Sequence, residues 1–424
     1  MLIALIIFIA LLLLRVPIAF VLGITTVFYI IISGNMGLLD TAPQRLYSGL
    51  ESYGLLAIPL FMMAGELMNS GGITKRLIDF AKTIIGHYRG GLAYVNVLAN
   101  MMLASIIGSA TAQIAMMSRI MVPAMEKAGY SKSFSSATTA AAGLLGPIIP
   151  PSMMFIIYGV TSGASIGQMF LAGVLPGILL GIGFILCIAF IGFKQQWTSS
   201  ERASASEMMT NFLKVLPALL VPAIIIIGIL SGVFTATESA AIACAVALVV
   251  GALFYRELQV KDFPQIMINT AITTATITML IAMANLFGWS ITFERIPQSL
   301  AEWMVSITEN PLLFLLIVNL FLLLVGMVLD GIAALIILVP IFMPIIAQFG
   351  IDPIHFGVII CFNLALGLLT PPIGTGLFIA SSIGKVKIET LTRAIWPFLG
   401  VAIVVLIIIT YFPQLVLWLP SLWF

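Results

Sequence analysis

Two Pro-Pro pairs mark points where the backbone itself could bind an ion. Pro150-Pro151 and Pro371-Pro372 each interrupt a long apolar segment. Two successive prolines remove two backbone N–H donors and leave carbonyl oxygens of the preceding turn without partners. Hard cations bind such oxygens, and the free N–H groups of neighbouring helix N-termini suit a carboxylate. A cation and an organic anion are therefore both candidate ligands of these breaks.

Two further irregular stretches lie within apolar segments. They are Gly108-Ser109-Ala110-Thr111 and Asp330-Gly331. Irregular backbone at membrane depth is tolerated only where it is buried in protein or lines a wet cavity. Small residues also permit close helix packing, which is the alternative interpretation of each stretch taken alone. Hydroxyl groups near the four irregularities could bind either ligand: Ser105, Ser109, Thr111, Ser152, Thr370 and Thr375.

Asp330 is an acid between Leu329 and Gly331, at the expected tip of a helical hairpin. A bare carboxylate in lipid is unfavourable, so the side chain must face water, a cation or backbone amides. Capping the second hairpin arm and coupling to an ion are both open interpretations.

An internal repeat pairs these features. Pro123-Ala-Met-Glu-Lys-Ala-Gly129, followed by Gly146-Pro-Ile-Ile-Pro-Pro151, recurs as Pro344-Ile-Ile-Ala-Gln-Phe-Gly350, followed by Gly367-Leu-Leu-Thr-Pro-Pro372, at a constant offset. Gly163 and Gly384 keep the same offset. Because four irregular motifs are paired in this way, a functional role is favoured over packing alone.

Each repeat reads as the same series of helical segments. The first contains helices 2–14, 16–33 and 46–69, an amphipathic connector (Ile73 to Tyr88), a hairpin at 91–126, a Pro-broken helix at 133–160 and a last helix at 168–193. The second contains helices 215–230, 236–255 and 267–290, a connector (Ile296 to Ile307), a hairpin at 311–347, a broken helix at 354–382 and a helix at 390–411.

Re-entrant hairpins would leave five crossings in each repeat, and an odd number inverts the second repeat relative to the first. The sequence thus predicts an all-α polytopic membrane protein of two inverted repeats, 1–193 and 215–424, joined by a cytoplasmic linker at 194–214. The prolines at 150, 151, 371 and 372 are its structural breaks.

Composition independently requires a membrane. Of 424 residues, 61% are apolar and only 8% are charged, and the mean hydropathy is +1.20. Three cysteines stand singly and only two histidines are present, which disfavours a disulfide framework, a metal cluster and an intramembrane metalloprotease. The formal net charge of +2 gives no indication of a nucleic-acid partner.

The basic residues orient this topology. If the N-terminus is outside, every Lys and Arg falls inside except Arg45 and Arg295, which lie outside, and Arg119, which lies within a hairpin. Cytoplasmic loops are enriched in Lys and Arg. Both termini are therefore predicted to be periplasmic, with the first hairpin entering from the cytoplasm and the second from the periplasm.

Four motifs in order resemble one transporter family over essentially the whole chain. They are Gly108-Ser-Ala-Thr-Ala-Gln113, Gly146-Pro-Ile-Ile-Pro-Pro-Ser152, Ile351-Asp-Pro-Ile-His-Phe-Gly357 and Gly367-Leu-Leu-Thr-Pro-Pro-Ile-Gly374. The sequence resembles the large membrane subunit of tripartite ATP-independent periplasmic (TRAP) transporters. No enzymatic activity is expected of such a chain.

The resemblance implies Na⁺-driven uptake of a small organic acid across the bacterial inner membrane by an elevator motion. A soluble periplasmic binding protein delivers the substrate in such systems, and a small four-helix membrane subunit, expected here as a separate chain, is the constant partner in the bilayer. By motif position, one Na⁺ site would use carbonyls around Gly108, Ser109, Gly146 and Pro150, and a second those around Asp330, Gly331, Gly367 and Thr370. Substrate carboxylate would lie near Ser109, Thr111 and Ser152, with Ser105 and Thr375 as further candidates.

Two positions depart from the family pattern. Many relatives have an acid where this chain has Gln113, and a proline where it has Gly331.

C4-dicarboxylates, keto acids and sugar acids such as sialic acid all fit a site of hydroxyls and helix ends. A stand-alone Na⁺/organic-anion symporter, or an ion antiporter with similar hairpins, is the alternative function.

Overall fold

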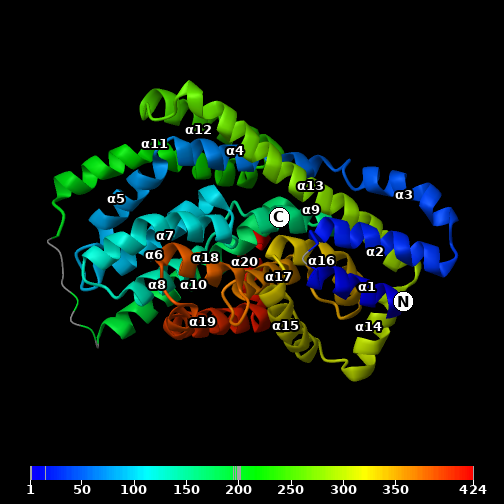
Figure 1. Cartoon of the computed structure of the whole chain (residues 1–424). Coiled ribbons are helices and arrows are strands. Elements are labelled where there is room, and N and C mark those ends of the chain that lie inside the picture. The colour runs from blue at the N-terminus through cyan, green and yellow to red at the C-terminus, as the bar shows by residue number, and fades with distance from the viewer. Residues whose placement is uncertain (1, 15, 194, 196, 198–201, 424) are drawn as a thin grey trace.

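The structure is a computed structural model that describes residues 2–14, 16–193, 195, 197 and 202–423. Every regular element in this part of the chain is helical (Figure 1). The N-terminal half contains α1 (Leu2–Leu13), α2 (Ile18–Ser33), α3 (Gly37–Ser48), η1 (Tyr53–Leu56), α4 (Ala57–Ser70), α5 (Ile73–Ile85), α6 (Gly91–Ile107), α7 (Ala110–Lys127), α8 (Lys132–Gly143), α9 (Met153–Ser162) and α10 (Ile166–Gly192).

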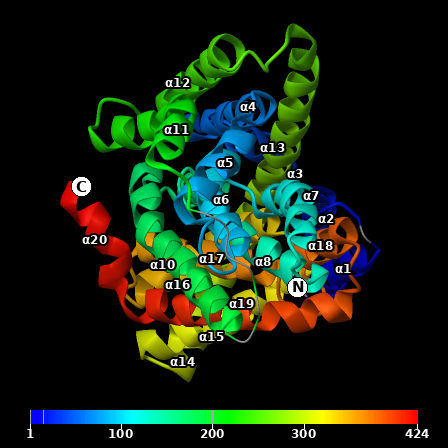
Figure 2. The same cartoon turned by 90° about the vertical axis from the view of Figure 1, so that its left-hand side faces the viewer.

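The C-terminal half follows a similar order. It contains α11 (Ala205–Leu230), α12 (Ala236–Val249), η2 (Val250–Phe254), η3 (Val260–Asp262), α13 (Phe263–Phe293), α14 (Ile296–Ile307), α15 (Pro311–Val328), α16 (Gly331–Gln348), α17 (Pro353–Gly367), α18 (Thr375–Gly384), α19 (Ile388–Tyr411) and α20 (Pro413–Trp423). Helix α20, which the sequence did not predict, lies against α10 (Figure 2).

The described residues include seven helices that are long and apolar enough to cross a membrane, or eight if the bent α3–α4 pair is one span. Exposed large apolar side chains are spread over these helices, as expected for surfaces that face lipid. The protein is therefore a multi-pass membrane protein, as its composition predicts.

The two predicted hairpins are present as pairs of helices. Helices α6 and α7 are separated only by Gly108 and Ser109, and α15 and α16 only by Leu329 and Asp330. The predicted broken helices are also present as α8 with α9 and α17 with α18. Each Pro-Pro pair lies in the non-helical stretch between its two pieces.

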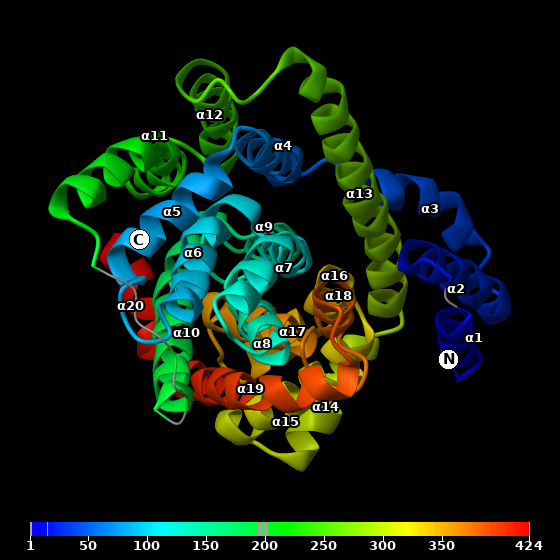
Figure 3. The ribbon, with the colours of Figure 1, turned by 60° about the vertical axis from the view of Figure 1, so that its left-hand side comes forward.

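The hairpins and broken helices of the two halves pack crosswise. Helix α9 packs on α16, and α18 packs on α7, so each broken helix places its second piece against the other half's hairpin. The Tyr158 hydroxyl of α9 donates a hydrogen bond to the backbone oxygen of Pro353 in α17. Figure 3 shows α4, α11, α12 and α13 curving along one side of these central elements.

The segment predicted as one helix at 46–69 is broken. Helix α3 ends at Ser48, η1 covers Tyr53–Leu56, and α4 follows at Ala57, with a bend of 51°. Ser48-Gly-Leu-Glu-Ser52 combines residues that favour turns and caps over helix interiors. Gly49 also lies against α13, because a Cβ placed there would be 2.5 Å from Nδ2 of Asn285. Helix α13, which occupies the corresponding position in the C-terminal half, has no such break.

The segment predicted as a linker at 194–214 is helical in its last part. Helix α11 begins at Ala205, where the Ser204 hydroxyl accepts a hydrogen bond of 3.1 Å from the Glu207 amide. Ser-x-x-Glu before an apolar run is a helix-start signal that the linker prediction overlooked. Residues 194, 196 and 198–201 lie outside the described residues.

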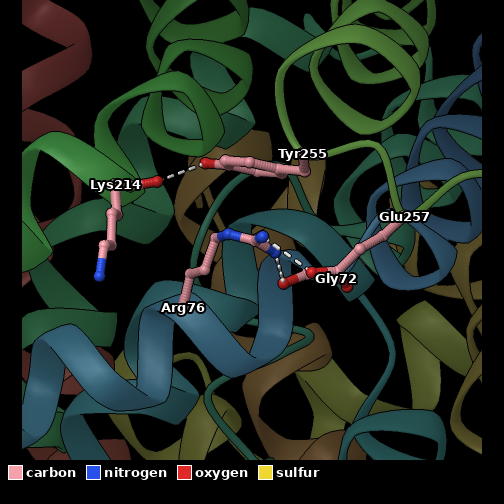
Figure 4. A network of polar contacts seen from close by, with 5 residues as sticks. All are labelled: Gly72, Arg76, Lys214, Tyr255 and Glu257. Carbon is pink, nitrogen blue, oxygen red and sulfur yellow. Dashed lines mark hydrogen bonds and ion pairs between the residues drawn. The ribbon is translucent and has the colours of Figure 1, made fainter.

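The two connectors form helices α5 and α14. Arg76 of α5 joins the halves: its Nη2 lies 2.7 Å from Oε1 of Glu257, and its guanidinium carbon lies 3.8 Å from the ring centre of Tyr255 (Figure 4). The Tyr255 hydroxyl in turn donates to the backbone oxygen of Lys214 in α11 at 2.8 Å. This network fixes α5 against both α11 and the segment after η2.

Candidate functional site

The tip of the first hairpin lies directly on the first Pro-Pro break. Gly108 ends α6 in the left-handed region, with φ of 62°, and its carbonyl oxygen accepts a hydrogen bond of 3.4 Å from the Met153 amide. A Cβ placed on Gly108 would lie 3.2 Å from the Pro151 oxygen and 3.3 Å from the Met153 nitrogen. Glycine therefore meets two demands at this position, a positive φ and a close approach of two backbones.

Gly146 brings a third element to the same place. A Cβ on this residue would lie 2.5 Å from Oε1 of Gln113 and 3.3 Å from the carbonyl oxygen of Ser109. Gly108, Ser109 and Gly146, which the motifs assign to one ion site, are thus brought together, and the Gln113 side chain joins them.

Hydrogen bonds fix the orientation of the Gln113 amide. Its Nε2 donates to the backbone oxygen of Asn100 at 2.7 Å and to Oδ1 of Asn100 at 2.8 Å. A backbone oxygen accepts only, so the NH₂ end of the amide must face Asn100. Oε1 therefore faces Gly146, where it is buried and has no donor among the described residues.

A buried chain of amides holds Gln113 in place. Asn100 Nδ2 donates to Asn96 Oδ1 at 2.9 Å, and Asn96 Nδ2 donates to the Thr139 hydroxyl at 2.7 Å. The chain links α6, α7 and α8. Sequence reasoning cited Gln113 only as a departure from the family pattern and missed Asn100, although an amide within an apolar membrane helix is itself a signal of a functional site.

The oxygen atoms at this point fit a hard cation. Gln113 Oε1 lacks a donor, and within the described part of the chain no hydrogen bond reaches the carbonyl oxygens of Gly146 or Pro150. Buried polar atoms almost always have a partner. Carbonyl and amide oxygens without donors are the ligand type that a hard cation such as Na⁺ takes.

The predicted hydroxyl ligands differ in how their oxygens are used. Ser109 Oγ and Thr111 Oγ1 lie 3.2 Å apart, both partly exposed, at the start of α7. Ser152 is fully buried and caps α9, because its Oγ accepts from the Phe155 amide at 3.4 Å and donates to the Pro147 oxygen. The Ser105 hydroxyl donates to the backbone oxygen of Met102 at 2.8 Å. Ser109 and Thr111 are thus the pair best placed for an external ligand.

The residues assigned to a second ion site are less closely gathered. A Cβ on Gly331 would lie 3.3 Å from the Met154 Cε of α9, whereas Gly367 meets Gly326, where a Cβ would lie 2.5 Å from the Gly326 Cα. The Thr370 hydroxyl, just after α17, donates to the backbone oxygen of Leu366 in α17 at 2.9 Å. Asp330 Oδ2 accepts from the Ile332 amide at 3.1 Å, so the capping interpretation of this acid is observed.

An amide pair beside this second set also escaped sequence reasoning. Asn363 Nδ2 donates to Oδ1 of Asn319 at 2.7 Å, and Asn319 Nδ2 donates to the Thr410 hydroxyl at 3.0 Å. Asn363 Oδ1 is buried and without a donor in the described residues. Pro371 is half-buried after α17, whereas Pro372, in the stretch before α18, and Thr375, the first residue of α18, are exposed.

Comparison with known proteins tests the resemblance. Residues 5–415 match the family described as "Tripartite ATP-independent periplasmic transporter, DctM component". The chain is 38% identical over 406 residues to the sialic acid TRAP transporter large permease protein SiaM of Vibrio cholerae, covering 96% of this chain and 95% of that protein. It is 39% identical to the C4-dicarboxylate large permease DctM of Pseudomonas aeruginosa, covering 89% and 88%.

Among solved structures, the Alcanivorax borkumensis YdaH transporter superposes with a TM-score of 0.62 at 14% identity, over 90% of this chain and 89% of that one. This likeness concerns the fold alone. The family match and the full-length relatives confirm the resemblance of the four motifs. The chain therefore belongs to the DctM family, the large permease component of tripartite ATP-independent periplasmic transporters, and is a transporter subunit rather than an enzyme.

Proposed function

We propose that this permease carries out Na⁺-coupled uptake of a small organic acid across the bacterial inner membrane, with the substrate handed over by a periplasmic binding protein. The observation that carries the proposal is the donor-free Oε1 of Gln113, buried against Gly146 and the Ser109 carbonyl. Buried oxygen atoms need a partner, and a bound cation stabilises a cluster of carbonyl and amide oxygens that has no donors. When bound, the cation supplies the positive charge that these oxygen atoms would coordinate.

The coupling site is formed by carbonyl oxygens around Gly108, Ser109, Gly146 and Pro150, with Gln113 as an amide ligand. Gln113 is neutral, so this site brings no charge of its own, unlike a site with a carboxylate at that position. Asp330, Gly331, Gly367 and Thr370 are the residues proposed for a second Na⁺ site, and their closer approach is part of the transport motion in this proposal.

The substrate carboxylate binds between the hairpin tips, at the Ser109–Thr111 hydroxyl pair. These hydroxyls are partly exposed beside the start of α7, and the first amides of a helix attract anions. Ser152, Ser105 and Thr375 complete the proposed set. Sialic acid and C4-dicarboxylates, the substrates named for two relatives, define the size range, and keto acids also fit it.

The transport motion is an elevator movement of the hairpins and broken helices past the outer helices. The crosswise packing of α9 on α16 and α18 on α7 supports this, because it joins the two hairpins into one block.

We place the two halves as inverted repeats with both termini in the periplasm, on the basis of the distribution of Lys and Arg. The small four-helix subunit is the membrane partner of the outer helices.

Uptake into proteoliposomes tests the proposal. Vesicles that hold this chain and its small partner are given radiolabelled N-acetylneuraminate, succinate or pyruvate, with an inward Na⁺ or K⁺ gradient, and with or without the binding protein. Uptake of one acid that needs both Na⁺ and the binding protein is expected. Na⁺-dependent uptake without the binding protein would instead identify a stand-alone symporter.

A further inference from the structure

Arg45, one of the two basic residues that the topology places outside, lines a cavity of about 420 Å³ away from the hairpin-tip site. The cavity lies where the break after α3 meets α13 on one side and α9 and α16 on the other. Its volume is within the range of small-molecule sites. The polar residues in its lining are Arg45, Ser48, Ser52, Thr161, Asn285, Trp289 and Thr292.

The Arg45 guanidinium is held over an aromatic ring rather than against an acid. Its Cζ lies 5.1 Å from the ring centre of Trp289. No carboxylate among the described residues lies within ion-pair distance of it. A guanidinium stacked on a ring keeps its fork of N–H donors available, and this fork matches the geometry of a carboxylate.

Asn285 supplies a second group with unused hydrogen-bonding capacity. It lies in α13, a 31-residue helix, and its amide is placed against Gly49 at the break. Within the described residues its side chain makes no hydrogen bond, whereas the hydroxyls of Thr161 and Thr292 bond to their own helices at 2.8 and 2.7 Å. A polar side chain in a membrane helix is expected to have a partner or a ligand.

We propose that this cavity is a second, outer binding site for the carboxylate of an organic acid, held by Arg45 and Asn285. The inference rests on the proposed function for the identity of the ligand. The walls come from both the outer helices and the hairpin block, so an acid bound here touches both groups of elements before it reaches Ser109 and Thr111. The Trp289 ring and the neighbouring Ile336 and Pro340 contact the rest of the molecule.

Protection of an introduced cysteine tests this site without requiring transport. Ser48 lines the cavity and is exposed, and its hydroxyl bonds only to the Arg45 backbone oxygen. The variant Ser48→Cys is labelled in the full chain with an anionic and a cationic methanethiosulfonate reagent. The unsubstituted chain, with Cys187, Cys244 and Cys361, gives the background.

We expect the anionic reagent to react faster, and succinate, pyruvate or N-acetylneuraminate to slow it. NaCl at the same ionic strength should slow it far less. Adding Arg45→Gln should raise the half-protecting acid concentration about tenfold or more, since a hydrogen bond to a charged group is lost. Arg295→Gln, which removes the other outer arginine, should leave protection unchanged. Asn285→Ala is a second variant that leaves the charge in place and should also weaken protection.

Two outcomes would overturn the site. The first is that NaCl and all three acids slow the labelling equally, which would indicate charge screening alone. The second is that protection by the acids survives both Arg45→Gln and Asn285→Ala. Failure of the proposed function gives a different pattern. If the acids protect the cysteine but uptake does not depend on Na⁺, the outer site is supported and the proposed function is contradicted. If uptake depends on Na⁺ but the acids do not protect the cysteine, only the outer site is contradicted.

Discussion

The Tyr158 hydroxyl donates a hydrogen bond to the backbone oxygen of Pro353, although the two residues are 195 positions apart. Tyr158 is fully buried in α9, and Pro353 is the first residue of α17. The bond therefore joins the second piece of one broken helix to the first piece of the other. It is one of the contacts that make the two hairpins and two broken helices a single block.

Tyr158→Phe should destabilise this block by about 0.5–1.5 kcal/mol, because it removes a buried hydrogen bond between two helices. The midpoint of thermal unfolding in detergent measures the change. Tyr411→Phe is the matched control, since the Tyr411 hydroxyl makes only an exposed contact of 3.4 Å with the Leu312 oxygen. Equal midpoints for the two variants would argue against a structural role for the Tyr158 bond.

Gly146→Ala should weaken Na⁺ activation of uptake. The added Cβ would lie 2.5 Å from Gln113 Oε1 and so must displace the amide or occupy the ion position. Loss of one charge-assisted ligand corresponds to about a tenfold or greater rise in the Na⁺ concentration for half-maximal uptake. Gly400→Ala is the control, because a Cβ at Gly400 meets nothing within 4 Å. An unchanged Na⁺ response of a folded Gly146→Ala variant would place the ion elsewhere.

The positions at which the helices are interrupted could be predicted because each is marked locally in the sequence. Gly108-Ser109 and Asp330 interrupt long apolar runs, and an internal repeat fixes the register of the two halves. The break between α3 and α4 was missed although Ser48-Gly-Leu-Glu-Ser52 favours turns, because the contact of Gly49 with Asn285 that accompanies it comes from a distant helix.

The side-chain part of the candidate site could not be predicted for a similar reason. Gln113 faces Gly146 only because Asn100 on the opposite hairpin arm accepts from its NH₂ end. Likewise, Arg45 and Asn285 share a cavity through packing of α3 on α13. Hydropathy and motif spacing contain no information about which face of one helix meets another.

Asp330→Ala should destabilise the second hairpin by about 1 kcal/mol, the usual effect of losing an N-cap, whereas Asp330→Asn should retain the cap. Asn can still accept from the Ile332 amide, and the backbone oxygen proposed as an ion ligand is unaltered. We therefore expect Asp330→Asn to keep both the unfolding midpoint and the Na⁺ dependence of uptake.

Asp352 offers the control, because its carboxylate caps α17 through the Ile354 and His355 amides at 2.8 and 3.0 Å. Asp352→Ala should lower the unfolding midpoint as Asp330→Ala does. If Asp330→Asn were stable but lost its Na⁺ dependence, the carboxylate charge would be part of the coupling mechanism and the capping role alone would be insufficient.

Arg76 and Glu257 should show a small but measurable coupling. Their atoms lie 2.7 Å apart, but the side chains are 23% and 46% exposed, so solvent weakens the attraction. A double-mutant cycle with Arg76→Gln and Glu257→Gln should give a coupling of about 0.5–1 kcal/mol in thermal unfolding, reduced by added salt. Arg76→Gln alone should lower the unfolding midpoint more than Glu257→Gln alone, because Arg76 also contacts the Tyr255 ring and the Gly72 oxygen.

The control is the pair Lys82 and Asp79, which lie 3.7 Å apart on the same helix and should show weaker coupling. Equal coupling in the two cycles would mean that the Arg76–Glu257 pair contributes no more than an ordinary exposed ion pair within one helix.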